Sequence, residues 1–173
     1  MAAKMRSAGI LLYRNKEEDL QVFIGHPGSP LWAKKDEGFW GIPKGTIDEN
    51  ESPLQAAKRE FTEETGLQVP AGELIELGEV EQYGKKIVSA WAIEFEGDTS
   101  GAKSGLFKLE WPPRSGNFQE YPELDRLEWF DLQEAALKIN KYQIVFLERL
   151  AAHLGVKYEP GTGAQQSELK LER

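Results

Sequence analysis

The chain has 173 residues and a formal net charge of −8, and it is long enough for one domain with a sizeable core. The acidic balance argues against a protein that coats nucleic acid, because phosphate binding needs a basic face. The lack of cysteine excludes disulfides and thiolate metal sites, and His26 and His153 are too few for a histidine-built site. Any metal is therefore expected on oxygen ligands, which suits Mg²⁺ or Mn²⁺.

The sequence shows no segment that would target or cross a membrane. The apolar run 10–13 is too short for the core of a signal peptide. No run of about 18 apolar residues, the length that spans a bilayer, occurs in the sequence. We therefore expect a cytoplasmic protein with no membrane partner.

The first half of the chain is predicted to contain a strand pair, a functional loop and a helix. Apolar runs predict strands over 7–14 and 20–25. Residues 26–45 are rich in Gly, Pro, Lys and Trp, which is typical of a structured loop that carries function. A helix is expected to follow over 53–65.

The second half begins with two more predicted strands, over 74–82 and 86–96, with a hairpin turn between them. Residues 97–122 are rich in Gly, Ser and Pro, and we expect them to form a long loop. A short strand is predicted over 126–130.

Two helices are predicted near the C-terminus. Asp131 and Glu134 form a D-x-x-E capping signal for the first, and helical spacing of apolar residues predicts the second over 141–154. Residues 1–156 are expected to form one domain, and the polar residues 157–173 a flexible tail. Because strands and helices mix without regular βαβ alternation, the expected class is α+β with a mixed sheet.

The helix predicted over 53–65 has signals at both ends. Ser52 and Gln55 form an S-x-x-Q capping box, and Gly66 suits the left-handed position after the last turn. Within this helix, Leu54 and Phe61 share an apolar face.

An acidic stripe made by Glu60, Glu63 and Glu64 lies beside that apolar face. These carboxylates repel one another at i,i+3 and i,i+4 spacing, by roughly 0.2–0.5 kcal/mol per pair. They also oppose the helix dipole at its negative end, by roughly 0.3–1 kcal/mol each when exposed. A divalent cation would reverse the sign of both effects, and without one the stripe is a solvated acidic face. Helix geometry alone leaves both interpretations open.

A longer pattern includes this stripe. Gly45 and Glu51 precede the run REFTEETGL of residues 59–67 at the spacing G-x5-E-x7-R-E-U-x-E-E-x-G-U. This resembles the Nudix box at every fixed position, with Phe61 where an aliphatic residue is commoner. The preceding residues 40–45, WGIPKG, are similar to the segment that leads into the box in many Nudix hydrolases. The whole chain looks most similar to small bacterial members described as predicted NTP pyrophosphohydrolases.

The resemblance, which extends over residues 6–154, implies an α/β/α sandwich with a loop–helix–loop metal site. In the family, an arginine matching Arg59 orients a box glutamate, and Glu51 is its expected partner here. The expected metal ligands are the Gly45 carbonyl and the carboxylates of Glu60, Glu63 and Glu64. Catalytic roles are expected for Arg59, Glu60 and Glu63.

The family cleaves a nucleoside diphosphate linked to another group, X, by attack of water on phosphorus. A diphosphate ester carries several negative charges, and its leaving group gains more. Metal ions can neutralise that charge, orient the phosphates and lower the pKa of a bound water. The acidic stripe is then held at a local energetic cost because the metal site needs it.

Many family members use a further carboxylate from outside the box. Residues 122–130, PELDRLEWF, resemble the P-E-x-D-x-x-x-W run of RNA pyrophosphohydrolase-like and dinucleoside-tetraphosphatase-like members. The matching glutamate is Glu123, which is expected to act as a metal ligand or as a base. Glu120 is the alternative, and a loop glutamate without a role remains open.

The loop before the box supplies candidate substrate contacts. Lys44 could bind a phosphate or be a solvated lysine, and Lys35 is a weaker candidate of the same kind. Trp40, with the neighbouring Trp32 and Phe39, could stack on a base.

Nucleoside triphosphates and dinucleoside polyphosphates are the leading substrate classes, and RNA 5′ ends and nucleotide sugars are alternatives. A small phosphorylated nucleotide is the expected partner, no long nucleic acid is expected, and a homodimer is left open. A non-catalytic Nudix-fold nucleotide-binding domain is a rival, although such domains have usually lost box glutamates. An unrelated acidic interaction domain would require an accidental match to the box.

Overall fold

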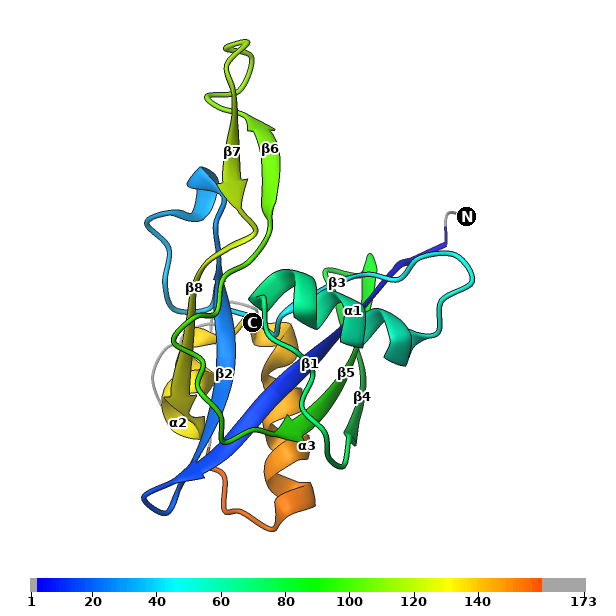
Figure 1. The fold of residues 1–173 in the computed structure, drawn as a ribbon, viewed down its shortest axis with the longest axis vertical. Coiled ribbons are helices and arrows are strands. Elements are labelled where there is room, and N and C mark those ends of the chain that lie inside the picture. Colours follow the sequence, from blue (N-terminus) through cyan, green and yellow to red (C-terminus); the bar gives the residue numbers. More distant parts are fainter. Residues whose placement is uncertain (1–2, 160–173) are drawn as a thin grey trace, which may run out of the picture.

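The computed structural model describes residues 3–159, and a mixed six-stranded sheet forms its centre (Figure 1). The strands follow the order β4-β5-β1-β2-β8, with β3 paired to β1. β1 runs parallel to β5 and antiparallel to β2 and β3, so the sheet is mixed. The strand bounds are β1 Met5–Lys16, β2 Asp19–Pro27, β3 Lys44–Thr46, β4 Ile75–Gln82, β5 Lys86–Glu94 and β8 Leu124–Asp131.

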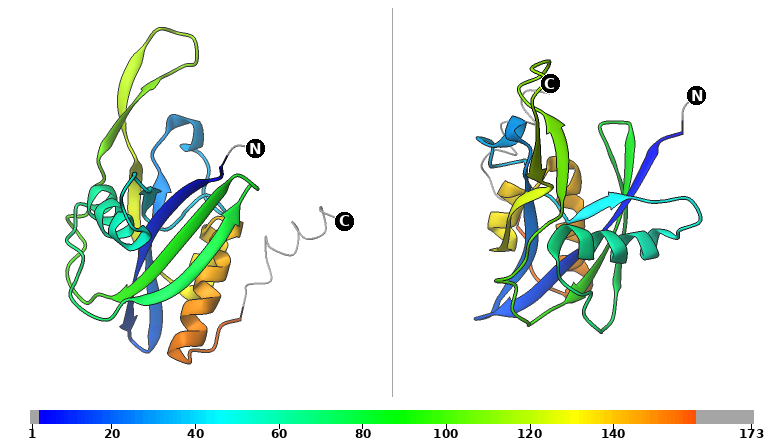
Figure 2. Two further views of the ribbon diagram at one scale, coloured as in Figure 1. Left: turned by 90° about the vertical axis from the view of Figure 1, so that its right-hand side faces the viewer. Right: turned by 45° about the horizontal axis from the view of Figure 1, so that its top comes forward.

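Helices cover both faces of this sheet, as Figures 1 and 2 show. α1 (Pro53–Thr65) packs on one face, while α2 (Leu132–Lys138) and α3 (Ile144–Leu154) pack on the other. The expected α/β/α sandwich is therefore confirmed. None of the helices in residues 3–159 is long and apolar enough to cross a membrane.

The central strand β1 explains why the two layers form. Leu11 contributes to the core beneath α2 and α3, whereas Ile10 and Leu12 contribute to the core beneath α1. Successive side chains of a strand point to opposite faces, so a strand buried on both faces reads as a continuous apolar run. On the α1 side, these residues pack in the same cluster as Phe61, which is fully buried.

The predicted helices near the C-terminus form with small differences. The Asp131 carboxylate accepts a hydrogen bond from Glu134 N at 2.8 Å and caps α2. The last helix begins three residues later than predicted, because a short 3-10 turn, η2 (Lys141–Gln143), precedes α3. The Asn140 side chain caps that turn by accepting from Tyr142 N at 2.9 Å.

The prediction of a long loop over 97–122 is wrong. Two strands, β6 (Leu106–Glu110) and β7 (Phe118–Pro122), pair antiparallel within it and form an arm that stands clear of the sandwich in Figure 1. No residue of either strand is buried, so the alternating burial that marks a core strand is missing. The glycines and serines of the segment all lie outside the two strands, and they gave the whole segment the composition of a loop.

The expected C-terminal tail, 157–173, lies outside the described residues from residue 160 onward. Within the described part, Tyr158 packs against the core cluster that contains α3. The domain boundary at residue 156 stays a prediction.

The capping box at the start of α1 should contribute measurably to stability. Ser52 Oγ accepts a hydrogen bond from Gln55 N at 3.2 Å. We expect Ser52→Ala to destabilise the protein by about 1 kcal/mol and to lower Tm by about 2–4 °C. Thermal unfolding with Ser52→Thr as a control would check this, because threonine keeps the accepting oxygen. A Ser52→Ala Tm equal to that of the wild type would show that the cap contributes nothing.

Candidate active site

The helix α1 is held in one position and one rotation. Ser52 and Gln55 exchange hydrogen bonds in a complete capping box at its start. Gly66 ends it in the left-handed region, at φ 71°, with its N–H donating to Thr62 O at 2.8 Å. Phe61 is fully buried against the sheet, which fixes the direction in which the acidic stripe points.

Gly45 and Glu60, which are far apart in the sequence, meet closely. A Cβ built on Gly45 would lie 2.0 Å from the Glu60 carboxyl carbon. Only glycine therefore lets this carboxylate lie against the backbone of β3. Two of the expected metal ligands are brought together by this contact.

Arg59 organises the carboxylates around it, as the sequence predicted. Its guanidinium donates to both oxygens of Glu51, at 2.8 and 2.9 Å, which is a two-pronged geometry. Its Nη1 also donates to Glu60 at 2.8 Å and to Glu63 at 3.2 Å. The hydrogen bonds from Arg59 lower the pKa of Glu51 to about 2. Arg59 thus orients two box glutamates while Glu51 holds it in place.

Three carboxyl groups near this helix have raised pKa values. Burial raises the pKa of Glu60, which is 8% exposed. Burial and the nearby charges of Glu123 and Glu60 raise the pKa of Glu64 to about 8. Partial burial also raises the pKa of Glu123, which lines a pocket beside the helix together with Glu64. A divalent cation would favour the ionised form of each group.

The structure distinguishes the two carboxylates that were predicted from outside the box. Glu123 lies between β7 and β8, where its N–H donates to Gly105 O at 2.9 Å and its carbonyl accepts from Gly28 N at 3.0 Å. These backbone bonds place its side chain in the pocket with Glu64. Glu120 instead lies exposed on the β6–β7 arm, paired across the strands with Lys108.

A pocket of about 240 Å³ lies beside the acidic stripe. Lys44, Glu64 and Glu123 line it together with the amide side chains of Gln82, Asn140 and Gln143. Burial, followed by the charge of Lys86, lowers the pKa of Lys44 to about 8. Lys44 therefore lies where an anionic group in this pocket could contact it.

The other predicted substrate contacts are placed less favourably. Trp40 is 1% exposed, donates from Nε1 to Asp36 at 2.8 Å, and packs edge-on against Phe130 in the core. The prediction that its ring stacks on a base is therefore wrong, because the core covers the ring. The neighbouring Phe39 is 37% exposed and lines the pocket. The exposed Lys35 lies outside the pocket lining, with its ammonium 5.8 Å from the Phe39 ring.

The donor set fits a hard divalent cation by its chemistry. It offers carboxylates that disfavour one another's charge, together with the backbone at Gly45. As the side chains stand, no group of three acidic or imidazole side chains in residues 3–159 could hold an ion. Arg59 Nη1 lies between Glu60 and Glu63 and holds both carboxylates.

The sequence reasoning missed the amides of this pocket. Gln82 and Gln143 are 5% and 2% exposed, and they come from the end of β4 and from η2. Neither residue belongs to a motif, and a glutamine at the end of a strand usually indicates a solvated surface. Only the fold brings them together.

The comparisons with known proteins agree with this geometry. The model of the NUDIX domain matches residues 3–150. The chain belongs to the Nudix family. An RNA pyrophosphohydrolase of Bartonella henselae is 30% identical in an alignment of 151 residues that covers 74% of this chain and 76% of that protein. An 8-oxo-(d)GTP phosphatase of Mycolicibacterium smegmatis is 33% identical in an alignment of 115 residues that covers 63% of this chain and 35% of that protein.

Solved structures support the Nudix fold. A binary complex of the C. elegans Ap4A hydrolase superposes with a TM-score of 0.61 at 22% identity, covering 86% of this chain and 98% of that one. The NUDIX domain of Shewanella oneidensis NrtR, solved with ADP-ribose, superposes with a TM-score of 0.63 at 16% identity. The match covers 89% of this chain and 90% of that one. Taken with the family match, the complete Nudix box indicates a Nudix hydrolase.

Proposed function

We propose that this protein hydrolyses a phosphoanhydride bond in a nucleoside triphosphate or a dinucleoside polyphosphate, with Mg²⁺ or Mn²⁺ as cofactor. The observation that carries the proposal is the folded Nudix box. Within it, Glu64 lines a pocket together with Glu123 and Lys44, and Glu60 and Glu63 are near enough for their charges to act on Glu64. Groups suited to a cation and a group suited to a phosphate therefore lie side by side.

The ion would be held by the Gly45 carbonyl and by the carboxylates of Glu60, Glu63, Glu64 and Glu123. When bound, such an ion neutralises phosphate charge and makes a bound water more acidic. The chain's own residues orient these carboxylates, bind the phosphates and accept a proton. Arg59 orients Glu60 and Glu63 through hydrogen bonds, and Lys44 binds a phosphate oxygen. If Glu123 is not a ligand of the ion, its carboxylate in the same pocket is placed to accept the proton of the attacking water.

A triphosphorylated RNA 5′ end is the second candidate substrate. The relative from Bartonella henselae with that activity in its name favours it. The net charge of −8 favours contact with only the end of such a strand. Nucleotide sugars, a cytoplasmic location and a homodimer stay predictions. A binding domain without catalysis is disfavoured because every box glutamate is present.

The test is product release from a panel of nucleotides in Mg²⁺ and in EDTA. The panel holds dNTPs, oxidised dGTP, dinucleoside polyphosphates, nucleotide sugars and triphosphorylated RNA. Metal-dependent turnover of one class supports hydrolysis and names the substrate. Tight binding of a nucleotide with no turnover of any would instead support the non-catalytic domain.

The two carboxylates outside the box allow a matched comparison. We expect Glu123→Gln to lower kcat by roughly 10²–10⁴-fold, the range of general acid–base catalysis. Glu120→Gln should leave kcat close to the wild-type value, because Glu120 lies exposed on the arm. Steady-state rates of both variants on the preferred nucleotide check this. A folded Glu123→Gln variant with the wild-type kcat would remove Glu123 from the mechanism.

A further inference from the structure

The side-chain amides of Gln82 and Gln143 line the pocket that holds Lys44, Glu64 and Glu123, called here the catalytic pocket. Hydrogen bonds link the two amides in a chain in which each donor and acceptor is determined. Ile42 N, a backbone donor, bonds to Gln143 Oε1 at 2.9 Å. The other end of the Gln143 amide, Nε2, then donates to Gln82 Oε1 at 2.8 Å. Because a backbone N–H can only donate, it settles the orientation of both side-chain amides.

This direction leaves the Gln82 Nε2 group as the free end. No hydrogen-bond partner for it exists among the described residues, although Gln82 is only 5% exposed. Gln82 lines the pocket that also contains Lys44 and Glu64. The buried side-chain atoms without a partner in the described residues are Ser7 Oγ and Tyr158 Oη, so Gln82 Nε2 is not shut away from solvent. An amide donor that reaches a pocket with no partner in the protein is suited to an acceptor on a bound molecule.

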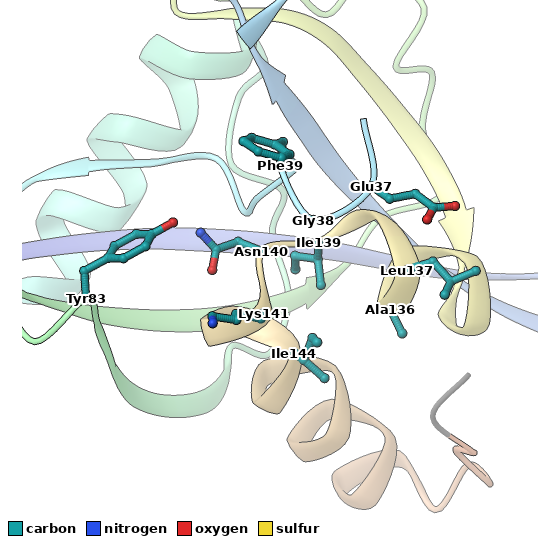
Figure 3. A pocket seen from close by; sticks show the side chains of 10 residues that line it. All are labelled: Glu37, Gly38, Phe39, Tyr83, Ala136, Leu137, Ile139, Asn140, Lys141 and Ile144. Carbon is teal, nitrogen blue, oxygen red and sulfur yellow. The ribbon is translucent and has the colours of Figure 1, made fainter. Parts of the chain in front are cut away.

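The surroundings favour a base over a phosphate as that acceptor. Beside the catalytic pocket lies a second hollow of about 190 Å³, and Phe39 and Asn140 line both. Figure 3 shows the rings of Phe39 and Tyr83 and the amide of Asn140 gathered around it. Tyr83 follows Gln82 directly and is 64% exposed. Flat aromatic surfaces suit a nucleobase, whereas the charged Lys44 already suits a phosphate.

We propose that Gln82 is a specificity residue that donates a hydrogen bond to an acceptor on the edge of the nucleobase. The proposal rests on the proposed function, because the base belongs to the nucleotide whose phosphates occupy the catalytic pocket. The pocket accordingly selects a base with a keto oxygen at this position over one with an amino group. Gln143 is a positioning residue that acts through Gln82.

The test compares triphosphates of inosine and adenosine in which methylene groups replace both bridging oxygens of the phosphate chain, so that neither anhydride bond can be hydrolysed. The two bases carry a keto and an amino group at the same ring position. Dissociation constants are measured calorimetrically in Mg²⁺. The wild type is expected to bind the inosine compound roughly tenfold or more tightly, the size of one discriminating hydrogen bond. Gln82→Met, which keeps the length and removes the donor, should bring the ratio near one.

Two further variants sharpen this test. Gln133→Met on the exposed surface of α2 is the matched control and should keep the wild-type ratio. Gln143→Met should lower the ratio towards one, because Gln82 loses the bond that orients it. A change in stability alone would leave the ratio of the two constants where it was.

Several results would overturn the proposal. The wild type could bind both compounds equally, prefer the adenosine compound, or bind neither. The ratio of the two dissociation constants could also be unchanged in Gln82→Met. The wild-type ratio decides the matter if Gln82→Met does not fold. A keto preference without hydrolysis of any nucleotide would refute the proposed function and leave this proposal standing. Hydrolysis with no base preference would refute this proposal and leave the proposed function standing.

Discussion

Replacing Glu60 by glutamine is expected to lower kcat/KM by roughly 10²–10⁴-fold, equivalent to about 3–5 kcal/mol of transition-state stabilisation. Glu60 is almost fully buried, bonds to Arg59 at 2.8 Å, and lies against the backbone of Gly45. Glutamine keeps the shape but removes the negative charge that a cation requires. The loss should therefore come from metal binding and not from unfolding.

The measurement is kcat/KM of Glu60→Gln on the preferred nucleotide at saturating Mg²⁺. Glu128→Gln, an exposed change on β8, is the control and should retain wild-type activity. Circular dichroism of both variants shows whether they fold. A folded Glu60→Gln protein with undiminished kcat/KM would mean that the box glutamate does not take part in the reaction.

Replacing Glu64 by glutamine should lower the activity of the protein while it raises the stability of the metal-free form. We expect activity to fall by roughly 10²–10⁴-fold, as for a lost metal ligand. We also expect the metal-free protein to become more stable by about 1–2 kcal/mol above neutral pH, after a discount for the partial exposure of Glu64. The melting temperature would then rise by about 2–8 °C.

The direction of this change follows from the pKa of Glu64, which the fold raises from 4.5 to about 8. Between these pH values the folded protein holds a proton that the unfolded chain has released. Stability is therefore lost as the pH rises through this window, and the loss is complete above the folded-state pKa. Glutamine cannot ionise, so the variant avoids the loss.

Calorimetric unfolding in EDTA at pH 5 and at pH 9 checks this, with a repeat in Mg²⁺. In EDTA, the melting temperature of the variant should exceed that of the wild type at pH 9, and by a smaller difference at pH 5. Mg²⁺ should raise the melting temperature of the variant only slightly. A variant that is less stable than the wild type in EDTA at pH 9 would contradict the account, because Glu64 would then stabilise the fold without a metal.

The local signals in the sequence predicted where α1 begins and ends. Ser52, Gln55 and Gly66 mark the helix ends, and their preferences come from local hydrogen bonds and backbone conformation. The pairing of Arg59 with Glu51 was also predictable, because the box defines their spacing. Such features need only a few neighbouring residues to form.

Other features depend on contacts that the sequence does not reveal. Trp40 looked like a stacking residue from its basic surroundings, but tertiary packing buries it against Phe130. The arm formed by β6 and β7 has no buried face, so it gave no periodic signal. Gln82 and Gln143 join the site only because β4 and η2 meet beneath it.

We propose that the acidic stripe holds a metal ion for hydrolysis. The measurement to make is the initial rate of nucleotide hydrolysis by the wild type and by Glu63→Gln, as Mg²⁺ is added to protein first treated with EDTA. The account predicts a rate that rises from near zero and saturates in the wild type, and that stays near zero in the folded variant. Equal rates in EDTA and in Mg²⁺, or equal rates in the two proteins, would contradict it.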